Sequence, residues 1–153
     1  MLRNRKYKTG TRWGIWLWTD VDSEYIRRLH VLKTPWFAIC LHWILKPDAE
    51  PYVHDHPVTF LSLILRGGYC EERQQVWSGY AQRDEVRTTH RTHRWFNFIR
   101  ASKGDRHRIT HVFPKTLTVC FMGPKTREWG FWIDGKWVYW KDYYTKQREG
   151  VQL

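Results

Sequence analysis

Short stretches of the chain alternate hydrophobic and polar residues with a period of two, which is the pattern of β-strands. The segments 25–31 and 37–45 follow this pattern, and 58–65 is a dense aliphatic and β-branched run. Turn residues occur about every ten positions, as in a sandwich or barrel. Further strands are predicted at 69–77, 95–99, 107–112, 117–122, 129–132 and 136–140. We therefore expect an all-β fold of roughly eight to ten short strands.

Two glycine turns predict hairpins. Gly67 and Gly68 end the first dense apolar run and a second strand follows, so residues 58–77 are predicted to form one hairpin. Asp134 and Gly135 separate two aromatic strands. They give a strong type I′ signal, because both central positions of that turn need a positive φ.

The length and the absence of repeats favour a single domain. The chain has 153 residues, which suits one domain of ordinary size, and we assign all of 1–153 to it. Residues 1–12 are predicted to be a short basic N-terminal extension. Residues 79–94 are polar and basic and predict a loop or an irregular edge strand, and 145–153 predict a frayed tail.

Cysteine usage and the lack of long apolar runs indicate the compartment. No apolar run approaches the roughly 20 residues that span a bilayer, and the first residues have no signal-peptide pattern. We therefore expect no membrane partner. The three cysteines are widely spaced, odd in number and flanked by apolar residues. They are interpreted as buried thiols of a reducing compartment, the cytoplasm.

The charge favours an anionic partner. The formal net charge is +11, and arginine and lysine occur along most of the chain. A small anionic substrate, a nucleotide or a nucleic acid would fit this charge, and a solvated basic surface is the alternative. The sequence also has 11 Trp. The aromatic stretch 129–144 could stack on a base or sugar, or pack over the end of the barrel.

A histidine pair carries the candidate chemistry. His54 and His56 are two residues apart, so on a strand both rings face the same side. Burying both without partners would cost roughly 1–3 kcal/mol each, whereas a metal ion would satisfy both. His107 follows a glycine turn and opens a later strand, and we predict it as a third ligand. Fe, Mn, Ni and Zn all suit such a site, and a metal-free polar pocket is the alternative.

These motifs resemble the two signature motifs of the cupin superfamily. The likeness rests on His54-x-His56, the glycine pair at 67–68, and Gly104-x-x-His107. It implies a double-stranded β-helix, or jelly-roll barrel, in which the first motif and one histidine of the second hold a divalent metal. It also makes a homodimer plausible.

One cupin position is missing. The usual first motif has a glutamate four or five residues after its second histidine, where this chain has Phe60 and Leu61. Glu71 or Glu72 could replace it from the returning strand. Because adjacent strand residues face opposite sides, only one of them can point inward.

The whole chain also resembles a group of small cupin-like proteins of actinobacteria and their phages. This likeness implies a fold and no established activity. It rests on the segments 28–30, 34–35, 41–42, 54–57, 65–69, 107–109, 123–124 and 129–132, and on Trp137 and Trp140.

Residues near the motifs are candidates for catalysis and substrate binding. His42, on the strand before the first motif, is a candidate base, and the alternative is a satisfied core histidine. Tyr69 is a candidate acid, and Glu71 is a catalytic candidate as well as a ligand candidate. The arginines near the metal strands could hold a carboxylate or phosphate with two hydrogen bonds. They are Arg66, Arg106 and Arg108.

Three functions follow from these observations. The first is a metal-dependent cupin enzyme, an oxygenase, isomerase or hydrolase, acting on a small anionic substrate. A dioxygenase would need a redox-active metal. The second is a metal-free barrel like the cupin-like sugar epimerases, with a histidine base and Tyr69 as acid. The third is a basic, Trp-rich barrel that binds or sequesters nucleotides or nucleic acid without catalysis.

Overall fold

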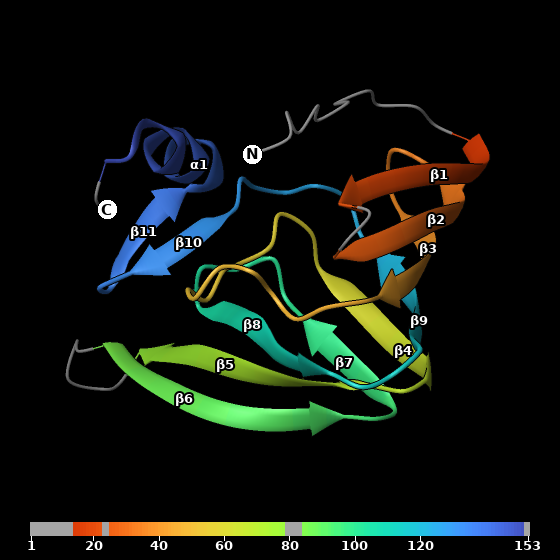
Figure 1. Cartoon of the computed structure of the whole chain (residues 1–153), viewed down its shortest axis with the longest axis horizontal. Helices are drawn as coiled ribbons and strands as arrows, with labels where there is room; N and C mark the ends of the chain where they lie inside the picture. The colour runs from red at the N-terminus through yellow and green to blue at the C-terminus, as the bar shows by residue number, and fades with distance from the viewer. Residues whose placement is uncertain (1–13, 23–24, 79–83, 152–153) are drawn as a thin grey trace.

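The computed structural model describes residues 14–22, 25–78 and 84–151, and the predicted extension at 1–12 lies outside these ranges. Within them the regular elements are β-strands, as predicted, and one helix near the C-terminus (Figure 1). The elements are β1 (Gly14–Asp22), β2 (Ile26–Lys33), β3 (Ala38–Ile44), β4 (Phe60–Arg66), β5 (Tyr69–Ser78), β6 (Asp84–His93), β7 (Phe96–Ile99), β8 (Asp105–Val112), β9 (Thr116–Met122), β10 (Gly130–Ile133), β11 (Lys136–Tyr139) and α1 (Trp140–Glu149).

The strands form two antiparallel layers. One sheet has the order β1-β2-β3-β9-β4-β7, and the other has the order β6-β5-β8. His54 forms isolated bridges with His107 of β8 and Phe131 of β10, so the hairpin β10–β11 continues the second layer. The interior lies between the layers, because one buried cluster combines residues of both. Its members are Ile26, Ile44, Ile64, Tyr69 and Ile109.

The predicted hairpin at 58–77 is wrong. β4 pairs with β9 and β7, whereas β5 pairs with β6 and β8. Gly67 and Gly68, with φ values of +73° and +125°, carry the chain from one sheet to the other. A period-two pattern identifies a strand and its buried face, but it does not identify the neighbouring strand.

Two further segments are more regular than the sequence predicted. Within the described part of the polar stretch, residues Asp84–His93 form the ten-residue edge strand β6, which pairs with β5 along its length. The predicted tail overlaps α1, which ends at Glu149 with Gly150 in the left-handed conformation. Tyr143 anchors the helix to the hairpin β10–β11, because this residue is only 2% exposed and packs against Phe131 and Ile133.

The C-terminal hairpin agrees with the sequence. Asp134 and Gly135 have φ values of +48° and +77°, as a type I′ turn requires. The aromatic residues around it pack mainly on one another; the rings of Trp129 and Trp140 are stacked with centroids 5.7 Å apart. In the described part of the chain, no helix has the length and apolar character needed to cross a membrane.

Alanine at Gly67 should destabilise the protein more than alanine at Gly135. The two glycines have similar φ values, +73° and +77°. A Cβ at Gly67 would lie 2.5 Å from Thr116 Oγ1 and 2.8 Å from its Cα, whereas a Cβ at Gly135 would meet nothing within 4 Å. We expect Gly135→Ala to cost about 1 kcal/mol and Gly67→Ala about 3 kcal/mol, measured by urea unfolding. Equal losses would contradict the close packing of the crossover against β9.

Candidate metal centre

Three histidines meet at one end of β8. The ligand nitrogens of His54, His56 and His107 all lie within 4.8 Å of one another. His54 and His107 are held together by two backbone hydrogen bonds, N–H of each to the carbonyl of the other, both 2.9 Å. His54 was predicted on a strand and instead occupies an isolated bridge, yet both predicted rings reach the same point.

The spacing of the His56 and His107 nitrogens suits a divalent metal ion. His56 Nε2 and His107 Nε2 are 2.8 Å apart. Two imidazole nitrogens bound about 2.1 Å from one ion at a right angle lie about 3 Å apart. Burial lowers the pKa of His54 to about 4, and burial together with the charge of His107 lowers the pKa of His56. Both rings are therefore neutral and offer the lone pair that a metal requires.

Glu71 fixes the orientation of His107. His107 Nδ1 lies 2.6 Å from Glu71 Oε2, and Glu71 is fully buried. Burial would raise the pKa of this carboxyl, but hydrogen bonds from His107 and His93 outweigh burial and hold the pKa below its ordinary value. An ionised carboxylate only accepts hydrogen bonds, so Nδ1 of His107 carries the proton. The lone pair of His107 is consequently on Nε2, which faces His56.

The structure gives Glu71 a different position from the predicted one. It points inward, but it contacts Nδ1 of His107, on the other side of the ring from Nε2, and it does not belong to the three-histidine group. Glu72 faces the opposite side of β5 and accepts a hydrogen bond from Arg108 Nε at 2.8 Å. Among the described residues, the candidate metal ligands are therefore three imidazoles. Glu71 contacts the nitrogen of His107 that faces away from this group.

A buried polar network holds Glu71 in place. Asn97 Nδ2 donates to Glu71 Oε2 at 2.9 Å, and His93 Nε2 lies 2.9 Å from Oε1. Arg73 contacts Asn97 Oδ1 at 3.2 Å and binds Asp105 through two hydrogen bonds of 2.8 and 2.7 Å. This network was not predicted from the sequence. Its only local signal was polar residues at inward positions of β5 and β8, two residues from Glu71 and His107.

Asp55 anchors the segment that carries the other two histidines. It lies between His54 and His56 in the sequence and is fully buried. Its carboxylate accepts hydrogen bonds from the backbone of Gly130 at 2.8 Å and from Trp137 Nε1 at 3.0 Å. It also pairs with Arg127 at 3.0 Å. The hairpin β10–β11 therefore fixes the position of the histidine pair.

His42 and Tyr69, the predicted base and acid, both face the interior. Tyr69 is 3% exposed, its hydroxyl accepts a hydrogen bond from Asn97 at 3.0 Å, and burial raises its pKa. His42 is 8% exposed, and burial and the charge of Arg28 lower its pKa. Within the described residues, no hydrogen bond joins either side chain to the three histidines.

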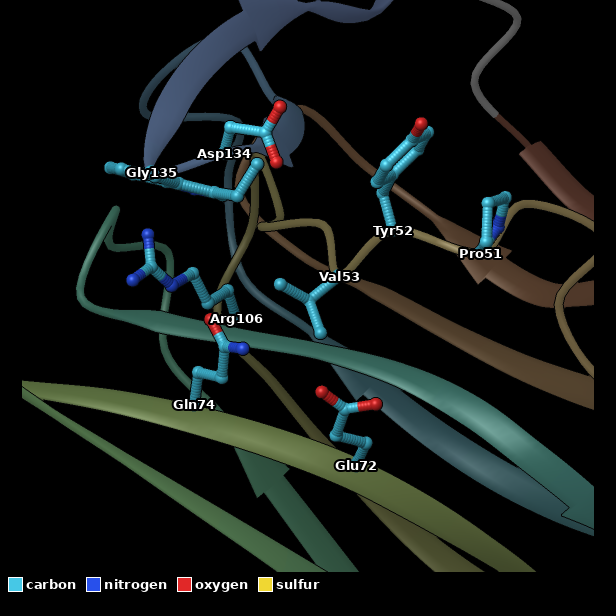
Figure 2. Close-up of a pocket in the computed structure, with 9 residues that line it drawn as sticks. Pro51, Tyr52, Val53, Glu72, Gln74, Arg106, Asp134 and Gly135 are labelled. Atoms are coloured by element: carbon cyan, nitrogen blue, oxygen red, sulfur yellow. The ribbon is translucent and has the colours of Figure 1, made fainter.

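The three predicted substrate arginines lie away from the histidines. Arg106 and Arg108 flank His107 on β8 and therefore face the outer side of the sheet, because neighbouring strand residues alternate. Arg108 pairs with Glu72. Arg106 covers the ring of Trp132 at 3.8 Å and lines an outer cavity of about 230 Å³ (Figure 2). Arg66 is exposed at the end of β4.

Arg28 brings a positive charge to the interior instead. It belongs to β2 and pairs across the sheet with His42. After burial, its charge is the next largest cause of the lowered pKa of His42, and it also lowers the pKa of His56, less than burial and the charges of His107 and His54. Arg28 was not among the predicted site residues, since an arginine in an alternating strand is more often on the solvent face.

Comparison of the sequence with protein-family models and with curated proteins gives no match. Among solved structures, the chain is similar to an RmlC-like cupin from Shewanella frigidimarina NCIMB 400, with 16% identity over 74% of this chain and 86% of that chain and a TM-score of 0.42. KdgF from Halomonas sp. has 14% identity, with 74% and 96% of the two chains covered and a TM-score of 0.43.

A recombinant oxalate oxidase in complex with glycolate has 10% identity, with 88% of this chain and 70% of that chain covered and a TM-score of 0.45. Within the described residues the fold of this chain is all-β apart from α1, with its strands in antiparallel sheets, as predicted.

Removing one histidine of the group should abolish stoichiometric metal binding. We expect the untagged protein, loaded with Zn(II) or Mn(II) and desalted, to retain about one ion per chain. His54→Ala and His107→Ala should each lose it, because two imidazoles hold an ion poorly. His111→Ala is the matched control, since His111 is exposed on the same strand. Elemental analysis measures the ratio, and a wild-type protein without metal would refute the site.

Glu71→Gln should weaken metal binding while leaving all three imidazoles in place. The amide lacks the charge that holds the proton on His107 Nδ1, so we expect the metal Kd to rise about 10–100-fold. Glu72→Gln is the control on the outer face and should leave the Kd unchanged. Competition with a chromophoric chelator gives both values. Equal Kd values for the two variants would contradict the orienting role of Glu71.

Proposed function

We propose that the protein is a metal-dependent enzyme of the cupin type that acts on a small anionic substrate inside the barrel. The observation that carries this proposal is the three-histidine group, with the lone pair of His107 directed by Glu71. Three protein ligands leave coordination positions open, which is typical of catalytic rather than structural metal sites. Arg28 adds a positive charge on the interior side, which favours an anionic substrate.

The residues of this chain would divide the work as follows. His54, His56 and His107 would hold the ion. When bound, it would supply Lewis-acid or redox chemistry, so the reaction classes are oxygenase, isomerase and hydrolase. Glu71 keeps a proton on His107 Nδ1, and Asp55 keeps the histidine pair in position. An oxygenase requires Fe, Mn or Ni rather than Zn, which is not redox-active.

The remaining predictions rest on the sequence. We propose an origin among the cupin-like proteins of actinobacteria and their phages, from the motif resemblance. We propose a cytoplasmic location, supported by the three free thiols Cys40, Cys70 and Cys120, all within the described residues. A homodimer and a nucleotide or nucleic-acid partner stay predictions.

Turnover should depend on the metal. We would reconstitute the chelator-treated protein separately with Fe(II), Mn(II), Ni(II) and Zn(II) and incubate it with a panel of small carboxylates and sugar phosphates. Substrate loss is followed by NMR and dioxygen uptake by an electrode. We expect turnover in at least one metal form and a loss of roughly 100-fold or more in His56→Ala, because the ion is then held poorly.

His90→Ala is the control, since His90 is exposed on β6 and lies outside the histidine group. Turnover that persists in the chelated protein and requires His42 and Tyr69 would instead support the metal-free epimerase-like barrel. Nucleic-acid binding that falls steeply with salt, without turnover in any metal form, would support the binding protein.

A further inference from the structure

Three polar side chains form a row across the interior face of the larger sheet. Arg28 of β2 pairs with His42 of β3, and His42 pairs with Thr118 of β9. The row faces inward, because Ile26 and Ile44, two residues from Arg28 and His42 on the same strands, belong to the core cluster between the sheets. These three residues therefore present their polar atoms side by side to the interior.

Each member of the row has a buried polar atom without a partner. Arg28 Nε, His42 Nε2 and Thr118 Oγ1 are inaccessible to solvent, and none has a hydrogen-bond partner in the described part of the chain. His42 is 8% exposed and Thr118 is fully buried. Buried polar groups are nearly always paired, and leaving them unpaired is costly. Three unpaired atoms on adjacent strands therefore indicate a ligand that the fold itself does not supply.

The chemistry of the three groups selects an acceptor with one negative charge. A guanidinium can only donate hydrogen bonds, a threonine hydroxyl can donate one, and a neutral histidine donates from one nitrogen. Burial and the charge of Arg28 lower the pKa of His42, so its ring is neutral. His30, the next inward residue on β2, is also neutral, because burial lowers its pKa to about 4. One guanidinium among neutral groups matches a carboxylate better than a doubly charged phosphate.

We propose that Arg28, His42 and Thr118 bind the carboxylate group of the substrate, with the rest of the molecule directed toward the three histidines. The row and the histidine group border the same core cluster, because Ile26 and Ile44 lie two residues from Arg28 and His42, and Ile109 lies two residues from His107 on β8. The assignment of a substrate rests on the proposed function, but the carboxylate site itself can be tested without metal.

The test uses acetate and inorganic phosphate as probes of the metal-free and Zn(II)-loaded protein, followed by NMR titration. We expect acetate to shift the Thr118 methyl and His42 ring resonances in both forms and phosphate to have little effect. Arg28→Gln should weaken acetate binding about 10–100-fold, because a charged hydrogen bond is lost. Arg27→Gln is the matched control, since Arg27 is the exposed neighbour on β2, and it should bind acetate like wild type.

Thr118→Val separates binding from a purely structural role. Valine keeps the shape but removes the unpaired hydroxyl, so the melting temperature without acetate should stay equal or rise. Acetate affinity should fall about tenfold. A hydroxyl with only a structural role would give a lower melting temperature and unchanged acetate binding, which would overturn the proposal. Phosphate binding tighter than acetate binding would overturn the carboxylate assignment.

The outcomes also separate this inference from the proposed function. Acetate binding that depends on Arg28 and Thr118 in a protein without metal affinity would support the row and refute the metalloenzyme. Metal binding with no acetate response in wild type would refute the row alone. If Arg28→Gln does not fold, the acetate affinity and melting temperature of Thr118→Val are sufficient to support or overturn the carboxylate site.

Discussion

The buried carboxylate of Glu71 is the constraint on which the site depends. A charge with no exposed surface is tolerated only when several donors surround it. Its donors come from β6, β7 and β8, which belong to both sheets. Pairing Glu71 therefore joins the two layers at the barrel interior, and the same hydrogen bond to His107 determines which ring nitrogen is free to bind a metal.

Side-chain alternation on β5 and β8 then determines the position of the other charged residues. Because Glu71 and His107 face inward, Glu72 and Arg108 face outward and pair with each other. Arg106 is likewise directed outward, onto Trp132. On a strand, the residues directly next to a candidate metal ligand therefore face away from the site and are poor candidates for contacting the substrate. Residues two positions away, such as Asp105, are the ones that share the ligand's side of the sheet.

Local patterns predicted most of the strands, the type I′ turn and the His54–His56 pair, since each depends on residues close in sequence or on one-sided burial, whereas β1 was not predicted. Strand partners were not predictable in this way. The assumption that 58–77 is a hairpin failed because β4 and β5 pair with other strands, and Gly67 and Gly68, both with positive φ, form the crossover between the sheets. The Arg28 row also required tertiary information, because its members come from strands that are distant in sequence.

The interior contains two kinds of polar group with opposite energetic meaning. Around Glu71 and Asp105 almost every donor meets an acceptor, so this side stabilises the fold and preorganises the histidines. Along Arg28, His42 and Thr118 the polar atoms remain unpaired at a cost to stability. Aliphatic residues could fill these positions, as they do at Ile26 and Ile44, and would avoid the loss of stability. The unpaired polar residues are therefore expected only if a ligand that binds them offsets this loss. The unpaired row is therefore the stronger indicator of function. The stability that the paired network supplies offsets the destabilisation caused by this row.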